Sequence, residues 1–171
     1  MPETIQTHRP TSRQSTLVPG ASAGTGAAKL RGLLLGGATT DSRAADLGLL
    51  ILRVFAGLAL ALTHGLGKIP PSDRFIVGVA EMGLPFPGLF AVLAATAEFG
   101  GGLLLALGLL TRPAAFLVAG NMLIISVLAH AGDPFGVREK PILFGAVALL
   151  FLLAGAGRYS LDALLRSSVE R

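Results

Sequence analysis

The sequence predicts an all-α protein, namely a membrane-spanning antiparallel four-helix bundle with a disordered N-terminal tail. Apolar residues make up 52% of the 171 residues, charged residues make up 14%, and the mean hydropathy is +0.70. This composition is typical of a membrane protein and not of a soluble core with a polar surface. The apolar residues also gather in four runs, each long enough for a membrane helix.

The first 45 residues contrast with the rest of the chain. They are rich in Ser, Thr, Gly, Ala and Pro, and they carry more basic than acidic residues. Because such a composition buries too little apolar surface to offset the entropy lost on ordering, residues 1–45 are predicted to form a disordered basic tail. Within this tail, the short segment Lys29–Leu35 is apolar enough to touch a membrane surface.

The predicted membrane domain covers residues 46–164, and residues 165–171 form a short C-terminal tail. Its four spans are predicted at residues 47–66, 89–110, 113–131 and 141–157. Asp46 is the expected N-cap of the first span. The mildly amphipathic segment Ser72–Met82 lies between spans one and two, where we expect a short helix that caps one end of the bundle.

The remaining connections also follow from the turn residues. Thr111-Arg112-Pro113 leaves room for only a very tight turn, so spans two and three must be antiparallel neighbours. The polar segment Gly132–Lys140 is expected to connect spans three and four, with Pro141 opening the fourth helix. The glycine-rich Gly155-Ala156-Gly157 is expected to end that helix.

The distribution of Lys and Arg predicts the orientation in the membrane. With the N-terminus inside, nine basic residues outside the spans lie on the inner side and four lie on the outer side. Basic residues prefer the cytoplasmic side, so both termini are predicted to be cytoplasmic.

Glu98 is an acidic residue near the middle of the second predicted span, within the sequence AATAEFGGG. A charge at that depth costs at least ~2.5 kcal/mol, so such a residue normally faces the bundle interior, pairs with a cation or is protonated. Arg53 in the first span is the predicted partner, because the two depths differ by roughly 7 Å. This pair is interpreted either as a structural link between the helices or as part of a proton or ligand site.

Three further side chains are candidates for the same site. His64 follows Arg53 by 11 residues, close to three helical turns, and is therefore expected on the same face. His64 and His130 are expected at one depth near the outer surface, where each could contact a ligand headgroup or be satisfied by water. Lys68 either reaches the interface or supplies a cation at the mouth of the site. Asn121 is expected to point away from His130 and to bond another helix.

Several classes of site are excluded or disfavoured by the sequence. The chain contains no Cys, which excludes disulfides, thiolate metal sites and thiol redox chemistry by this chain itself. No metal site is predicted, since the histidines and carboxylates lack the spacing of a metal-binding helix. The net charge of +4 comes from scattered basic residues, which fit cytoplasmic loops and anionic lipid better than nucleic acid.

An ordered set of motifs runs through residues 46–164. It comprises Arg53, His64-Gly65-Leu66-Gly67-Lys68, Pro85-Phe86-Pro87, Glu98 with Gly101-Gly102, Gly108-Leu109-Leu110-Thr111-Arg112, His130, and Gly157-Arg158-Tyr159-Ser160-Leu161-Asp162. Each motif is weak by itself, but the ordered set is specific. Together the motifs resemble the DoxX family of small four-helix membrane proteins.

The resemblance implies a four-span, multi-pass protein of the bacterial inner membrane. Some members of the family are tied to quinone reduction, as in the membrane subunit of a thiosulfate:quinone oxidoreductase, and others assemble with soluble oxidoreductases and superoxide dismutase in oxidative-stress defence. The polar positions of the family fall on Arg53, His64, Lys68, Glu98 and His130. These are the residues that the helical spacing had already singled out.

Three functions stay open at this point. The first is a subunit of a redox-linked membrane complex, with a quinone as the cofactor considered and Glu98 handling a proton. The second is a non-catalytic anchor for soluble oxidoreductases, and the third is a transporter of protons or small solutes. The lipid bilayer is the expected partner in each case. Formation of a homo-oligomer and catalysis by the isolated chain are both left open.

Overall fold

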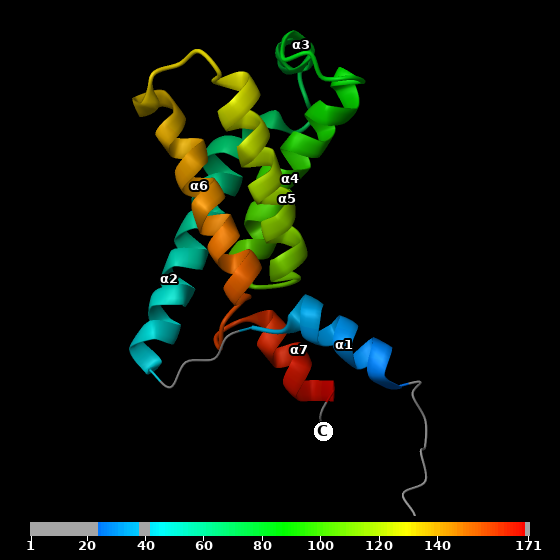
Figure 1. The fold of residues 1–171 in the computed structure, drawn as a ribbon, viewed down its shortest axis with the longest axis vertical. Helices are drawn as coiled ribbons and strands as arrows, with labels where there is room; N and C mark the ends of the chain where they lie inside the picture. The colour runs from blue at the N-terminus through cyan, green and yellow to red at the C-terminus, as the bar shows by residue number, and fades with distance from the viewer. Residues whose placement is uncertain (1–23, 38–41, 170–171) are drawn as a thin grey trace, which may run out of the picture.

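The computed structural model describes residues 24–37 and 42–169, and the secondary structure of this part is entirely helical (Figure 1). The α-helices are α1 (Gly24–Leu35), α2 (Arg43–Ala59), α3 (Asp73–Glu81), α4 (Pro87–Leu107), α5 (Thr111–Ile124), α6 (Phe135–Ala154) and α7 (Leu161–Val169). The π-helix η1 (Leu60–Gly65) and the 3₁₀-helix η2 (Leu66–Lys68) continue α2, while the π-helix η3 (Ile125–Ala129) continues α5. The predicted all-α class is confirmed.

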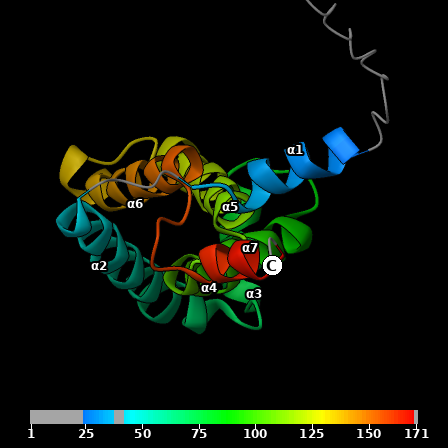
Figure 2. The same cartoon turned by 90° about the horizontal axis from the view of Figure 1, so that it is seen from below.

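Helices α2, α4, α5 and α6 form an antiparallel bundle. Seen from below, they surround a common centre, in which α4 packs against α2 and α5, and α5 packs against α6 (Figure 2). The core includes Leu60, Val118, Met122 and Phe151. Helix α3 lies across one end of the bundle, as Ser72–Met82 had predicted, and α1 and α7 lie at the other end (Figure 1).

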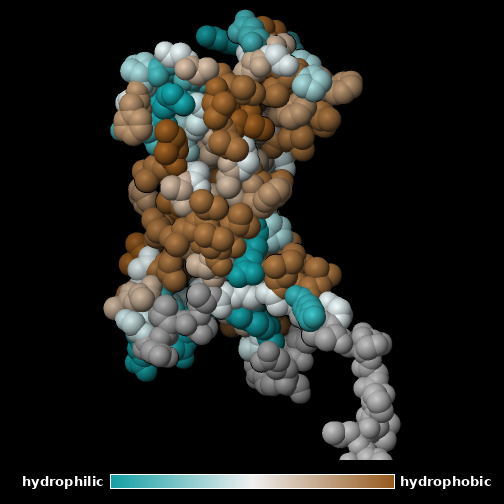
Figure 3. Space-filling view, in the orientation of Figure 1, coloured by the Kyte–Doolittle hydropathy of each residue, from teal (hydrophilic) through white to brown (hydrophobic). Residues whose placement is uncertain are grey.

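The outer surface of the bundle is largely apolar. Hydrophobic residues cover the middle of the face shown in Figure 3, and hydrophilic residues gather towards its two ends. Three described segments are long and apolar enough to cross a membrane, namely Arg43–Lys68, Pro87–Leu107 and Thr111–Ala129. Helix α6 is not among these apolar segments, because the charged run Arg138-Glu139-Lys140 lies within its first two turns.

The structure corrects the predicted start of the fourth helix. Gly132–Lys140 was predicted to be a connector, with the fourth helix starting at Pro141, but α6 begins at Phe135 and contains Pro141 within it. Pro134 has an extended ψ of 156° and immediately precedes the helix, so it marks the start that was assigned to the later proline. Lys140 therefore lies on α6, where its side chain can reach the bundle interior. The predicted stop is confirmed, since Gly155 follows the last helical residue with a φ of +75°.

The N-terminal region also differs from prediction. Helix α1 lies within the stretch that was predicted to be a disordered tail, and it contacts α5 and α7. The guanidinium of Arg112 donates to the carbonyl oxygens of Leu33 and Leu153, each at 3.1 Å, and so links the end of α1 to the end of α6. The average composition of residues 1–45 does not indicate that this short segment packs against α5 and α7. The rest of the predicted tail, residues 1–23 and 38–41, lies outside the described residues.

The start of the first span is corrected as well. Asp46 was predicted to be its N-cap, but α2 begins at Arg43 and Ser42 is the capping residue. The Ser42 hydroxyl accepts a hydrogen bond from the backbone N–H of Ala45 at 3.4 Å. Asp46 instead lies buried in the first turn, where a carboxylate interacts favourably with the helix dipole.

The turn between α4 and α5 is as tight as predicted, although α5 already begins at Thr111. Gly108 and Leu110 adopt left-handed backbone conformations, with φ values of +67° and +46°. The carboxylate of Asp162, just after the start of α7, accepts hydrogen bonds from the backbone N–H groups of Leu110 at 2.8 Å and Thr111 at 3.0 Å. Asp162 thus caps the start of α5 from a distant part of the chain.

Three glycines allow α2 and its π-helical continuation to approach α4 closely. A Cβ atom on Gly57 would lie 2.5 Å from the carbonyl oxygen of Gly102, and one on Gly102 would lie 2.8 Å from the carbonyl oxygen of Gly57. A Cβ atom on Gly65 would collide with the backbone nitrogen of Phe99. Small residues commonly permit such contacts between membrane helices. These contacts set the register, with Gly65 level with Glu98 and Phe99.

Replacing Gly65 with alanine is expected to destabilise the protein by about 1–3 kcal/mol, the usual cost of overpacking. The added methyl group would meet the backbone of α4, which cannot rotate away as the end of a side chain can. Unfolding of the purified protein in detergent measures the effect. Gly78→Ala on α3 is the matched control, because nothing lies within 4 Å of a Cβ atom there. Equal stability of the two variants would contradict this account of the crossing.

Candidate functional site

The carboxylate of Glu98 is buried at the centre of a polar cluster. Its side chain is 1% exposed, and it forms an ion pair with Lys68. The Lys68 Nζ atom donates to Oε1 at 2.7 Å and to Oε2 at 2.6 Å. The Nδ2 atom of Asn121 on α5 donates to Oε1 at 3.2 Å, which confirms that Asn121 bonds another helix. A buried carboxylate is tolerated when it is paired and hydrogen-bonded in this way.

Local helix geometry brings Lys68 to Glu98. The first span continues beyond α2 as a π-helix and then as the short 3₁₀-helix that contains Lys68. The close approach at Gly65 holds this continuation against the backbone of α4 beside Glu98. Lys68 lies one turn beyond Gly65, and its side chain is 29% exposed. The aliphatic part of the side chain therefore lies at the surface, while the ammonium group reaches the buried carboxylate of Glu98.

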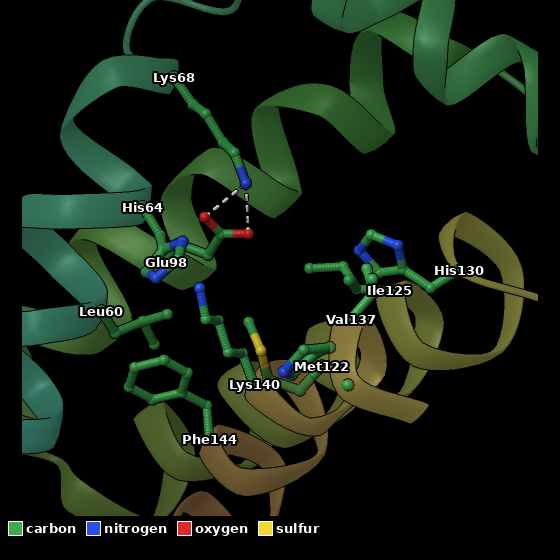
Figure 4. A pocket seen from close by; sticks show the side chains of 12 residues that line it. Leu60, His64, Lys68, Glu98, Met122, Ile125, His130, Val137, Lys140 and Phe144 are labelled. Carbon is green, nitrogen blue, oxygen red and sulfur yellow. Dashed lines mark hydrogen bonds and ion pairs between the residues drawn. The ribbon is translucent and has the colours of Figure 1, made fainter. Parts of the chain in front are cut away.

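A cavity of about 400 Å³ lies beside this ion pair. His64, Lys68, Glu98, His130 and Lys140 supply its polar groups, and Figure 4 shows them around the hollow, with the ammonium group of Lys140 directed into it. The apolar part of its wall consists of Leu60, Met122, Ile125, Val137, Pro141 and Phe144. The site is therefore an apolar hollow on which several polar side chains converge.

Both candidate histidines line this cavity, and each follows or lies in a π-helical segment. His64 is part of η1, and its ring packs edge-on against Phe144 with a centroid separation of 5.6 Å. His130 follows η3, and its backbone N–H donates to the carbonyl oxygen of Ile125, five residues earlier. The Nδ1 atom of His130 lies 2.7 Å from Oδ2 of Asp133. Short π-helical segments are often found at functional sites.

The predicted ion pair between Arg53 and Glu98 is wrong. The guanidinium of Arg53 is buried towards the other end of the bundle, where it donates to the carbonyl oxygen of Ala156 and, at 2.7 Å, to that of Tyr159. Arg53 thus fastens the chain segment that follows α6 and does not line the cavity. Its bonds to backbone carbonyls indicate a structural role.

The error comes from the register of the two helices. The prediction aligned the two spans by their apolar ends and so placed Arg53 and Glu98 at similar depths. In the structure, a Cβ atom on Gly108 would collide with the guanidinium of Arg53, so Arg53 lies level with the end of α4. Glu98 is ten residues earlier on α4, which corresponds to about 15 Å along the helix. The first turns of α4 extend past the first span and pack against α3.

Lys140 and Phe144 are site residues that the sequence analysis missed. Both face the cavity from α6, and the prediction had assigned Lys140 to a connector. Within the described part of the chain, the ion pairs are Lys68–Glu98 and His130–Asp133, so Lys140 remains an unpaired cation at the cavity. A helix start at Pro134 would have placed Lys140 and Phe144 one turn apart on the same face.

Comparisons with known proteins agree with this architecture. The family model described as DoxX matches residues 48–131. The chain is 35% identical over 124 residues to "Inner membrane protein YqjF" of Escherichia coli (strain K12), covering 70% of this chain and 93% of that protein. It is 30% identical over 131 residues to "Inner membrane protein YphA" of the same organism, covering 71% of this chain and 94% of that protein. No solved structure matches the chain. These similarities establish that the chain belongs to the DoxX family.

Proposed function

We propose that this DoxX-family protein resides in the bacterial inner membrane and binds a quinone headgroup in the cavity beside Glu98, as a subunit of a redox-linked assembly. The location is supported by the apolar helices and by the names of the two relatives. The function is supported chiefly by the convergence of hydrogen-bond donors on an apolar cavity.

The cavity suits a flat apolar ring with polar oxygens. Its volume of about 400 Å³ falls within the usual range of small-molecule sites. A quinone ring needs apolar walls, which Leu60, Met122 and Phe144 offer. Its carbonyl oxygens need donors, which the imidazoles of His64 and His130 can provide. Donors from separate helices therefore meet around one small hollow.

The chain also supplies groups that can hold a proton at this cavity. A quinone supplies two-electron chemistry when bound, and its reduction takes up two protons. Glu98, the two imidazoles and the ammonium groups of Lys68 and Lys140 are the side chains in the cavity wall that can exchange protons. The chain contains no Cys, so we assign the supply of electrons to a soluble oxidoreductase partner. Proton delivery and headgroup binding are the roles left to this subunit.

A binding titration tests the proposed function. The protein is reconstituted in nanodiscs and titrated with 2,3-dimethoxy-5-methyl-1,4-benzoquinone, with calorimetry as the readout because the chain has no Trp. The His64→Ala/His130→Ala double variant is expected to bind roughly tenfold more weakly, because about two net hydrogen bonds are lost. Phe55→Ala, which changes a side chain 72% exposed on the outer face of α2, should bind as the unmodified protein does. Absence of binding to the unmodified protein would refute the proposal.

A further inference from the structure

A second cavity lies on the far side of the Lys68–Glu98 ion pair. It has a volume of about 260 Å³ and is lined mainly by residues of α3, α4 and α5. Its wall is mostly apolar and includes Val79 from α3, Ala94 from α4 and Gly120 from α5. Polar side chains enter it mainly where it meets the ion pair. This apolar cavity adjoins the hollow assigned to the headgroup.

The ion pair lies where the two cavities adjoin. Lys68, Glu98 and Ile125 line both of them. The Nζ atom of Lys68 also lies 5.2 Å from the ring centroid of Phe75 on α3, a favourable cation–π contact. The same ammonium group thus holds the buried acid on one side and the covering helix on the other.

The apolar cavity leads to the surface that faces lipid. Phe116 and Leu117 at its edge are 66% and 51% exposed, and Leu93 is 51% exposed. These residues lie on α4 and α5, which are two of the helices apolar enough to cross a membrane. Helix α3 covers the cavity with an apolar side, on which Val79 is 3% exposed. A hydrocarbon chain in this cavity could therefore continue directly into the bilayer.

We propose that the cavity under α3 receives the hydrocarbon chain of the ligand whose headgroup lies beside Glu98. This inference rests on the proposed function and defines the ligand as a long-chain, lipid-borne quinone. Three observations support a chain as the occupant: the apolar wall, the opening towards lipid, and the lining residues shared with the headgroup cavity. The ion pair then marks the boundary between head and chain.

Two variants that fill the cavity test the inference. Gly120→Leu adds a side chain where nothing lies within 4 Å of a Cβ atom, and Ala94→Phe enlarges a residue of the opposite wall. Gly48→Leu is the matched control, because Gly48 is also open but lies in the first turns of α2. Each protein is titrated in nanodiscs with the tail-less benzoquinone and with its 6-decyl derivative, and affinities for the latter are expressed per mole of lipid.

The unmodified protein is expected to bind the decyl derivative more tightly than the tail-less form. Both filling variants should weaken binding of the decyl derivative roughly tenfold and leave binding of the tail-less form unchanged, while Gly48→Leu should change neither. If the unmodified protein binds both probes and the filling variants alter neither, or weaken both equally, the cavity does not hold the chain. If the unmodified protein binds neither probe, the proposed function fails, and this inference fails with it.

Discussion

Replacement of Arg53 by leucine is expected to destabilise the protein by roughly 3–5 kcal/mol. Arg53 is 2% exposed, and its guanidinium donates hydrogen bonds to the carbonyl oxygens of Ala156 and Tyr159. Without it, both oxygens lose a charged donor, at a cost of about 1–3 kcal/mol for each buried group left without a partner. Asp162 also loses a cation that attracts it.

Chemical unfolding in detergent measures this loss. Arg53→Lys should lie between the unmodified protein and Arg53→Leu, because an ammonium group keeps the charge but cannot reach two carbonyl oxygens in the same planar arrangement. Arg158→Leu is the control, since Arg158 is an exposed arginine in the same segment. If Arg53→Leu and Arg158→Leu unfold at the same denaturant concentration, Arg53 does not fasten this end of the bundle.

Replacement of Lys68 by methionine is expected to cost about 3 kcal/mol, because it leaves the buried carboxylate of Glu98 without its cation. Asn121 remains as a donor to one oxygen, which does not compensate a charge. The Lys68→Met/Glu98→Gln double variant should recover most of the lost stability, because it removes the charge together with its partner. Glu98→Gln alone should cost less than Lys68→Met, because Lys68 is 29% exposed and can reach water.

A double-mutant cycle shows whether the Lys68–Glu98 ion pair stabilises the fold or is a surface contact that contributes little to stability. Losses that simply add in the double variant would show that the two side chains do not depend on each other. The cycle also matters for function, because a folded Glu98→Gln protein allows the role of the acid in proton exchange to be studied separately from its role in stability.

Residue patterns along single helices predicted much of the fold. The apolar runs located α2, α4 and α5, the tight turn at Thr111 made α4 and α5 antiparallel, and the amphipathic Ser72–Met82 located α3. Each depends on local spacing, hydrophobic periodicity or turn chemistry, which are visible in one sequence. Proline positions were less informative, since both Pro134 and Pro141 fit a helix start and only the former marks one.

The candidate site was predicted only in part, because partners across helices depend on register. Glu98 was correctly expected to be buried and paired, and Lys68 was considered as a cation at the site, but the partner chosen was Arg53. That choice assumed that helices align by their apolar ends. The contact between Gly57 and Gly102 fixes a different alignment, and sequence spacing within one helix carries no record of it. Lys140 was missed for a related reason, because its helix begins earlier than expected.

The winding of two helices controls which way the histidines of the cavity point. His64 lies in one π-helical segment and His130 directly follows another, and each segment holds more residues per turn than an α-helix does. Removing one residue from either segment is expected to restore ordinary α-helical winding and to change the direction of the side chains within that turn. The shape of this cavity therefore depends on the number of residues between the close helix contacts as much as on the identity of the residues that line it.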